Sequence, residues 1–231
     1  MTRFGPRGFI LETDHPIAAD TVDHQHPHGT KNDNTRWPRF VAACERHFGA
    51  GLSVLDLGCA GGGLVSDFTE RGHNAIGLEG SNYSLLSRRA EWPVIPDRLR
   101  TCDLRHPFAI WEIDGSLMQF DVVSAWDVLE HIPETALSTL LQNVRRHLKP
   151  SGVFTGTVST RPSKPAPDGR NYHATVRDRE WWRKRFYESG FVETEPPPFE
   201  TEDYPRGNGI NFPANFVVAP EQGFFVNLRP A

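Results

Sequence analysis

A glycine-rich turn directly after a short apolar run is the feature that most constrains the fold. Residues 53–57 read Ser-Val-Leu-Asp-Leu, and four of the next six residues, 58–63, are glycine. Glycine lets the backbone bend sharply and approach a ligand closely. Leu64, Val65 and Phe68 then have helical spacing, so the first free N–H groups of a helix would face the same place. This order predicts a strand, a ligand-binding turn and a helix of a parallel α/β sheet.

Strand and helix patterns alternate along the rest of the chain. Apolar runs predict further strands at 75–79, 99–104, 120–125, 153–158, 191–194 and 223–228. Helical spacing predicts helices over 38–48, 81–89, 137–148 and 178–189. Ser81 is the expected N-cap of the second helix and Asp178 that of the fourth. Trp181, Trp182 and Phe186 are the expected core residues of the fourth helix. This alternation predicts an α/β fold with a doubly wound, mostly parallel seven-stranded sheet and helices on both faces.

The ends and loops of the chain have a different composition. Residues 1–38 are rich in Pro, Gly, His, Asp and Asn and predict an irregular N-terminal arm that can close over the ligand as a lid. Residues 39–231 are expected to form one domain, with Pro- and Gly-rich substrate loops at about 159–175 and 196–215. The residues in these loops that suit a sugar, a ring, a phosphate or a carboxylate are Arg161, Arg170, Tyr172, Phe199, Tyr204, Arg206 and Phe212. Alternatively, the aromatic side chains only close the edge of the sheet.

Composition excludes several classes of protein. Apolar residues make up 38% and charged residues 23%, which is typical neither of a disordered chain nor of a membrane protein. With a net charge of -4, the protein lacks the broad positive field expected of a dedicated nucleic-acid binder. Three scattered cysteines fit neither a disulfide framework nor a zinc spacing, and residues 1–20 contain no apolar run, so no signal peptide is expected. We therefore expect a cytoplasmic protein, with Cys102 in the core.

Several segments together resemble the class I (Rossmann-like) S-adenosylmethionine-dependent methyltransferases. Residues 54–62 are similar to motif I of that family, an apolar pair followed by D-x-G-x-G-x-G, with Ala60 in place of the middle glycine. Residues 102–104, 120–132 and 148–153 resemble later motifs, so the resemblance covers about residues 50–195. It implies S-adenosylmethionine as methyl donor and an antiparallel last strand. An NAD-dependent oxidoreductase is disfavoured, because its G-x-G-x-x-G motif requires glycine at the position of Ala60.

The resemblance implies a set of cofactor contacts. Glu79, which ends the second strand, would accept hydrogen bonds from the ribose hydroxyls, and Asp103 would meet the adenine. Asp56 would hold the loop or the methionine amino group, although capping the helix is its alternative role. The full cofactor-binding set expected is Asp56, Gly58, Cys59, Ala60, Gly62, Glu79, Gly80, Ser81, Asp103, Leu104, Ala125 and Trp126.

Two histidines are candidate catalytic bases, because the pKa of imidazole lies near neutrality. His131 ranks first, since it follows the fourth strand by a few residues, and His173 in the first substrate loop ranks second. A metal-assisted alternative would use Asp127, Glu130 and His131 with a further histidine, but no metal is expected. The arm histidines 24, 26 and 28 are interpreted as a solvated or substrate-facing loop.

The predicted function is methyl transfer from S-adenosylmethionine to a small molecule, glycan or nucleotide sugar, as O-methylation with a histidine base. The alternatives are a non-catalytic S-adenosylmethionine-binding partner protein and an RNA methyltransferase. The basic residues of 177–185 alternate with Trp181 and Trp182, which favours a solvated helix face over nucleic-acid binding. No membrane partner is expected.

Overall fold

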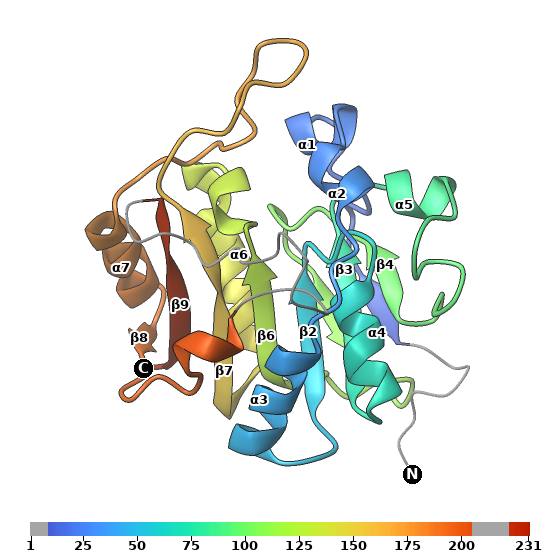
Figure 1. The fold of residues 1–231 in the computed structure, drawn as a ribbon, viewed down its shortest axis with the longest axis vertical. Coiled ribbons are helices and arrows are strands. Elements are labelled where there is room, and N and C mark those ends of the chain that lie inside the picture. Colours follow the sequence, from blue (N-terminus) through green and yellow to red (C-terminus); the bar gives the residue numbers. More distant parts are fainter. Residues whose placement is uncertain (1–8, 205–221) are drawn as a thin grey trace.

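The computed structural model describes residues 9–204 and 222–231 and is built around a seven-stranded sheet (Figure 1). In chain order its strands are β2 (Ser53–Leu57), β3 (Asn74–Glu79), β4 (Leu99–Thr101), β6 (Phe120–Trp126), β7 (Leu148–Ser159), β8 (Phe191–Glu193) and β9 (Gly223–Pro230). Across the sheet the order is β4-β3-β2-β6-β7-β9-β8. Neighbours from β4 to β7 pair in parallel, and β9 pairs antiparallel with both β7 and β8. The predicted sheet is therefore confirmed, including its antiparallel last strand.

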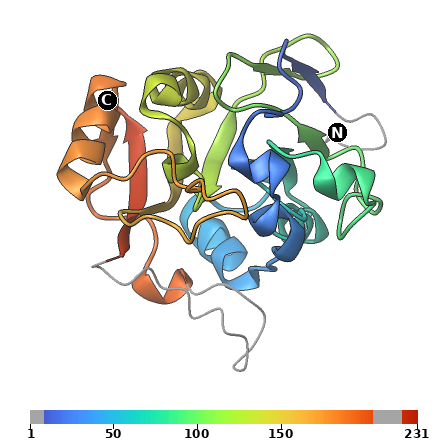
Figure 2. The same cartoon turned by 90° about the horizontal axis from the view of Figure 1, so that it is seen from above.

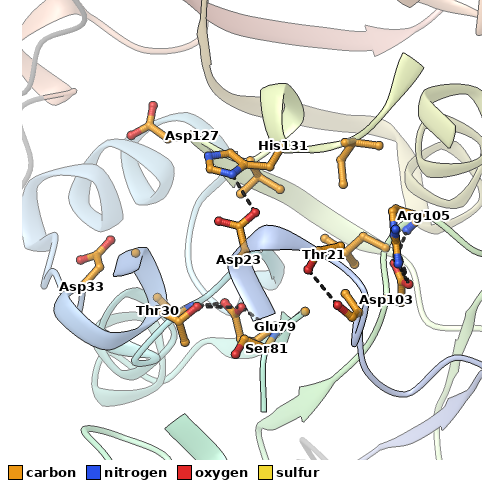
Figure 3. Close-up of a pocket in the computed structure, with 18 of the residues that line it drawn as sticks. Thr21, Asp23, Thr30, Asp33, Glu79, Ser81, Asp103, Arg105, Asp127 and His131 are labelled. Carbon is orange, nitrogen blue, oxygen red and sulfur yellow. Dashed lines mark hydrogen bonds and ion pairs between the residues drawn. The ribbon is translucent and has the colours of Figure 1, made fainter. Parts of the chain in front are cut away.

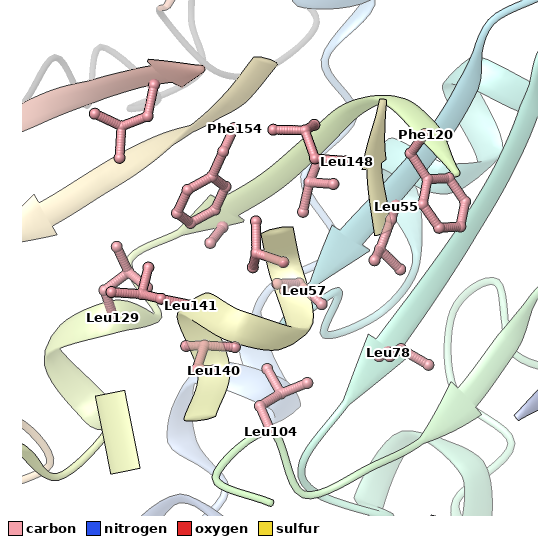
Figure 4. Packing of buried hydrophobic residues seen from close by; sticks show 14 of the residues in the cluster. Leu55, Leu57, Leu78, Leu104, Phe120, Leu129, Leu140, Leu141, Leu148 and Phe154 are labelled. Carbon is pink, nitrogen blue, oxygen red and sulfur yellow. The ribbon is translucent and has the colours of Figure 1, made fainter. Parts of the chain in front are cut away.

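Helices cover both faces of the sheet, as the alternation predicts. On one face, α6 (Glu134–His147) and α7 (Arg179–Glu188) pack on a core that contains Leu55, Leu57 and Phe154 (Figure 4). On the other face, α3 (Pro38–Phe48) and α4 (Gly63–Glu70) pack on a core that contains Val54. Leu55 and Val54 are neighbours in β2 but belong to different cores, because successive side chains of a strand point to opposite faces.

Local signals determine where two of these helices begin. Pro38 is the first residue of α3, where proline has the fixed φ that a helix needs and loses no hydrogen bond. Asp178 caps α7, and its side chain accepts a hydrogen bond of 2.8 Å from the Trp181 N–H. Both predicted starts are confirmed. Trp182 and Phe186 of α7 are buried as expected, whereas Trp181 is only partly buried. In the parts of the chain that the structure describes, no helix has the length and apolar character of a membrane span.

Three predicted boundaries were wrong. The helix expected over 81–89 is only α5 (Tyr83–Leu86), with Asn82 rather than Ser81 at its N-cap. It ends early because Arg88 takes a left-handed φ of 50°, which turns the chain out of the helix. The strand expected over 99–104 stops at Thr101, and Leu148 begins β7 instead of ending α6.

The N-terminal segment, which was expected to be irregular, contains regular elements. Its β1 (Ile10–Glu12) pairs antiparallel with β5 (Ala109–Trp111) in a second, two-stranded sheet. It continues with α1 (Val22–Gln25) and α2 (His28–Asn32), which lie near α5 at one end of the main sheet (Figures 1 and 2). These short elements are stabilised by docking, because short helices are marginal on their own. Two 3-10 turns, Leu129–His131 and Thr201–Asp203, complete the described structure.

Replacing Leu140 by alanine should destabilise the fold by about 2–5 kcal/mol, because the side chain is fully buried and its removal leaves a cavity. Leu86→Ala is the matched control, since Leu86 is also helical but 72% exposed. Denaturant unfolding measures both changes. Equal effects of the two substitutions would contradict the placement of α6 on the core.

Candidate functional site

The site lies where the chain changes direction across the sheet. From β2 the chain continues to β3 and β4 on one side, and it later returns to β6 and β7 on the other. The carboxyl ends of β2 and β6 therefore form a crevice of the kind that binds ligands in open α/β sheets. Gly58 follows β2 with a φ of 71°, and a Cβ added there would lie 2.4 Å from Cγ2 of Val128, which follows β6. The close approach of the two turns explains why this position is glycine.

Ala60 also has a left-handed backbone, with a φ of 47°. The resemblance places glycine at this position, and alanine in this conformation costs about 1 kcal/mol. Two hydrogen bonds hold it there. Its N–H donates to Oε2 of Glu79 over 2.8 Å, and its carbonyl accepts from the Trp92 indole N–H over 2.9 Å. The alanine therefore retains the glycine-type turn through contacts with neighbouring segments.

A cavity of about 290 Å³ opens at this crevice (Figure 3). The residues of the predicted set that line it are Gly58, Ala60, Glu79, Gly80, Ser81, Asp103, Leu104, Trp126 and the candidate base His131. Asp56 and Cys59 line a smaller cavity that shares Asp33, Gly58 and Trp126 with the first. Gly62 and Ala125 are not among the lining residues of either cavity. The fold thus gathers most of the predicted residues, from separate turns, around two neighbouring cavities.

Asp56 is held inside the sheet next to the small cavity. It pairs in register with Ser124 of β6, and the Ser124 hydroxyl donates a hydrogen bond of 2.7 Å to its Oδ1. Asp56 is buried and Ser124 is fully enclosed. This contact fixes the carboxylate at the switch point of the sheet.

Glu79 is a buried carboxylate that three donors satisfy. Besides the Ala60 N–H, the Ser81 N–H donates over 3.0 Å and the Thr30 hydroxyl donates over 3.2 Å, both to Oε1. Burial raises the pKa of Glu79, and these hydrogen bonds oppose that rise because they favour the charged form. The carboxylate is thus fixed in place while it lines the cavity.

Asp103 is held by a residue that the sequence analysis missed. The guanidinium of Arg105 contacts both oxygens of Asp103, at 2.9 and 2.6 Å, and also forms an ion pair with Asp20 of the arm. Arg105 itself lines the cavity. The Asp103 carboxylate is therefore oriented by a charge that also anchors the arm.

The N-terminal arm supplies one wall of the cavity. The sequence pattern identifies none of the six arm residues that line this wall as a site residue. They are Ala18, Thr21, Asp23, Gly29, Thr30 and Asp33. Arg89 holds this wall by donating to the carbonyls of Thr30 and Asp33, each over 2.8 Å. The sequence predicts only that the arm can close over the ligand as a lid. It does not predict these individual contacts, because polar residues in a loop-like segment do not reveal what they contact.

His131 forms a pair with Asp23 across the cavity (Figure 3). Nδ1 of His131 lies 2.9 Å from Oδ2 of Asp23. Burial lowers the pKa of His131, but the hydrogen bond and charge of Asp23, together with Glu130 and Asp127, raise it overall to about 9. A carboxylate behind the imidazole fixes its tautomer and stabilises its protonated form.

His173 lies beside His131 rather than in the cavity lining. The ring centroids are 4.9 Å apart, and Nδ1 of His173 lies 2.6 Å from the carbonyl oxygen of Arg161. Burial lowers the pKa of His173. Glu130, His131 and His173 each offer one ligand atom, and these atoms lie within 4.8 Å of one another. Asp127 lines the cavity but is not part of this group.

Other candidate residues have separate contacts. Nε2 of His26 lies 3.0 Å from Oδ2 of Asp168, and His28 bonds to Asn32, so within the described residues the arm histidines form no metal-type group.

Phe199 and Tyr204 are buried in an aromatic cluster with Phe40, which supports the alternative that they close the sheet. Cys102 is fully buried, as expected, and burial raises its pKa to about 12. Arg206 and Phe212 lie outside the described residues.

Comparison with known proteins agrees with this arrangement. The family model described as a methyltransferase domain matches residues 30–195. The curated ubiquinone biosynthesis O-methyltransferase of Pseudomonas aeruginosa strain UCBPP-PA14 is 32% identical over 120 residues, which cover 49% of this chain and 47% of that protein. The chain therefore spans about half the length of the curated relatives it matches.

Solved structures share the fold at low sequence identity. The CcbJ methyltransferase from Streptomyces caelestis has a TM-score of 0.58 and 14% identity, over 95% of this chain and all (100%) of that chain. The 1,6-didemethyltoxoflavin-N1-methyltransferase of Burkholderia thailandensis, bound to 1,6-didemethyltoxoflavin and S-adenosylhomocysteine, has a TM-score of 0.55 and 19% identity, over 90% and 84%. These likenesses show the class I methyltransferase fold.

The glycine turn predicts opposite outcomes for two substitutions. Gly58→Ala should destabilise the protein by about 1–3 kcal/mol, because the new Cβ meets Val128 and the φ is positive. Ala60→Gly should be neutral or stabilise by up to about 1 kcal/mol, because relief of strain offsets the greater entropy of the unfolded chain. Thermal or denaturant unfolding measures both. A clear loss of stability in Ala60→Gly would contradict the left-handed conformation of this residue.

Proposed function

Because the chain belongs to the methyltransferase-domain family, whose class I fold uses S-adenosylmethionine as methyl donor, we propose that it methylates an oxygen atom of a small-molecule or glycan acceptor. One observation carries this proposal. A single cavity is lined by Glu79 and Asp103, which suit the nucleoside, and by the Asp23–His131 pair, which suits the reacting end.

The donor would be held by residues of three turns. The Glu79 carboxylate, already fixed by backbone N–H groups, would accept hydrogen bonds from the ribose hydroxyls. Asp103 would accept from the adenine amino group. The smaller cavity next to Asp56 would take the methionine part, whose amino group carries a positive charge.

Two observations support a catalytic small-molecule enzyme over the alternatives. The Asp23–His131 pair lies in the cavity, and a protein that only binds the cofactor has no need of it. The basic face of α7 is neutralised by ion pairs such as Arg179–Glu193 at 3.4 Å and Arg183–Glu180 at 3.1 Å, which disfavours RNA. The relatives also favour small acceptors: the curated ones are O-methyltransferases of ubiquinone biosynthesis, and the Burkholderia protein binds 1,6-didemethyltoxoflavin.

The proposed reaction is a direct displacement. A lone pair of the acceptor oxygen attacks the methyl carbon, the carbon–sulfur bond breaks, and its electron pair stays on sulfur, which leaves S-adenosylhomocysteine. The hydroxyl proton passes to Nε2 of the neutral form of His131, which prevails only above about pH 9 because the pKa of this imidazole is raised to about 9. Asp23 accepts the Nδ1 hydrogen and stabilises the imidazolium that forms. The protein contributes mainly by aligning oxygen, carbon and sulfur.

Glu79→Ala should weaken S-adenosylmethionine binding about tenfold to hundredfold, the size of lost hydrogen bonds to a charged group. Calorimetric titration measures this, and the wild-type protein should bind S-adenosylmethionine but not NAD. Glu180→Ala, on the exposed face of α7, is the matched control and should bind normally. Preference for NAD would overturn the proposed function, and unchanged affinity in Glu79→Ala would overturn the ribose assignment.

His131→Ala should lower turnover about 10²–10⁴-fold and spare S-adenosylmethionine affinity, because the residue acts on the acceptor. Transfer of a labelled methyl group to a panel of phenolic, acidic and glycan acceptors measures turnover. His47→Ala, at an exposed position of α3, is the control and should retain full activity. Full activity of His131→Ala would exclude it as the base.

A further inference from the structure

Glu130 carries a buried oxygen that the proposed function does not use. The residue is fully enclosed, and its Oε1 accepts a hydrogen bond of 3.0 Å from the Ser159 N–H. Its other oxygen, Oε2, is buried and has no hydrogen-bond partner in the structure described. An unsatisfied buried carboxylate oxygen is costly, so a site of this kind needs a proton or a cation.

The two neighbouring histidines are oriented as metal ligands usually are. A histidine that binds a metal generally donates its other ring N–H to a carboxylate or a backbone carbonyl. Nδ1 of His131 contacts the Asp23 carboxylate, and Nδ1 of His173 contacts the Arg161 carbonyl. Both contacts leave Nε2 as the nitrogen that remains for a ligand.

The surrounding fold brings the three residues together. Glu130 and His131 belong to the same 3-10 turn, which follows β6. Thr175 ties the first substrate loop to this turn, since its N–H donates to the Glu130 carbonyl over 2.9 Å and its hydroxyl donates to the Ile132 carbonyl over 2.7 Å. These bonds place His173, two residues earlier, beside His131.

We propose that Glu130, His131 and His173 bind one divalent transition-metal ion. Their ligand atoms lie within 4.8 Å of one another, slightly wider than the roughly 4 Å that ligands on opposite sides of one ion span. Small movements of the side chains close this gap. Two imidazoles and one carboxylate suit Mn²⁺, Fe²⁺, Co²⁺ or Zn²⁺ better than Mg²⁺, and they leave positions open for other ligands. Nearby Asp23 and Asp127 add negative charge that favours a cation.

A role of this ion in methyl transfer rests on the proposed function, whereas the binding of the ion does not. His131 lines the cavity, so an ion on its Nε2 can take the acceptor oxygen as a further ligand. The ion lowers the pKa of the bound hydroxyl, whose proton then leaves to water. In this loaded form His131 acts as a ligand, and the proton no longer passes to it.

Titration of the chelator-treated full chain with Co²⁺, without donor or acceptor, tests the site. We expect one ion per chain and an absorption spectrum that reports nitrogen ligands. Glu130→Gln and His173→Ala should each lower the affinity at least about tenfold. His47→Ala, an exposed histidine of α3, is the matched control and should bind like the wild type. His173 is only partly buried in a loop, so its substitution is expected to leave the fold intact.

Equal Co²⁺ affinity in the wild type and both variants would overturn the metal site, and Glu130 would then hold a proton. That result leaves donor binding by Glu79 and transfer by His131 untouched, because calorimetry and labelled-methyl transfer measure them separately. Conversely, failure to bind S-adenosylmethionine would overturn the proposed function while the Co²⁺ titration still decides the site.

Discussion

The buried carboxylate of Glu79 is the contact on which the site depends. Its oxygens accept hydrogen bonds from the Ala60 N–H in the glycine-rich turn, the Ser81 N–H after β3, and the Thr30 hydroxyl of the arm. A charge enclosed to this extent is stable only when it is well hydrogen-bonded. Satisfying it therefore requires that the turn adopt its left-handed backbone and that the arm dock on the domain. One residue thus joins three segments that are far apart in the sequence.

The two halves of the site have different origins in the fold. The half that we propose to bind the donor lies at the ends of β2, β3 and β4, where the parallel sheet itself positions Asp56, Glu79 and Asp103. The reacting half depends on segments that dock on the sheet, because Asp23 comes from the arm and His173 from the loop after β7. A rigid sheet suits a cofactor that is the same for the whole family, whereas docked segments can differ between acceptors.

Electrostatics link the arm to the reacting end of the cavity. Asp23, Asp127 and Glu130 all raise the pKa of His131, although burial opposes them. Burial, and after it like-charge repulsion from Asp127, raise the pKa of Glu130 as well. Such a group of carboxylates around one imidazole attracts positive charge, either as a proton or as a bound cation. The same surroundings therefore stabilise both the imidazolium that the proposed proton transfer forms and a cation at the proposed metal site.

The sequence by itself determined the sheet, its alternation with helices, and the helix starts at Pro38 and Asp178, because periodicity and local turns record which face is buried and where a strand ends. Tertiary structure alone decided the regular elements of the arm, the role of Arg105 and the contacts of His131. Asp23 and His131 are 108 residues apart, and Thr30 and Glu79 are 49 apart. Local patterns carry no information about which distant polar groups meet. Those pairings follow from how the docked segments satisfy buried charges on the folded sheet.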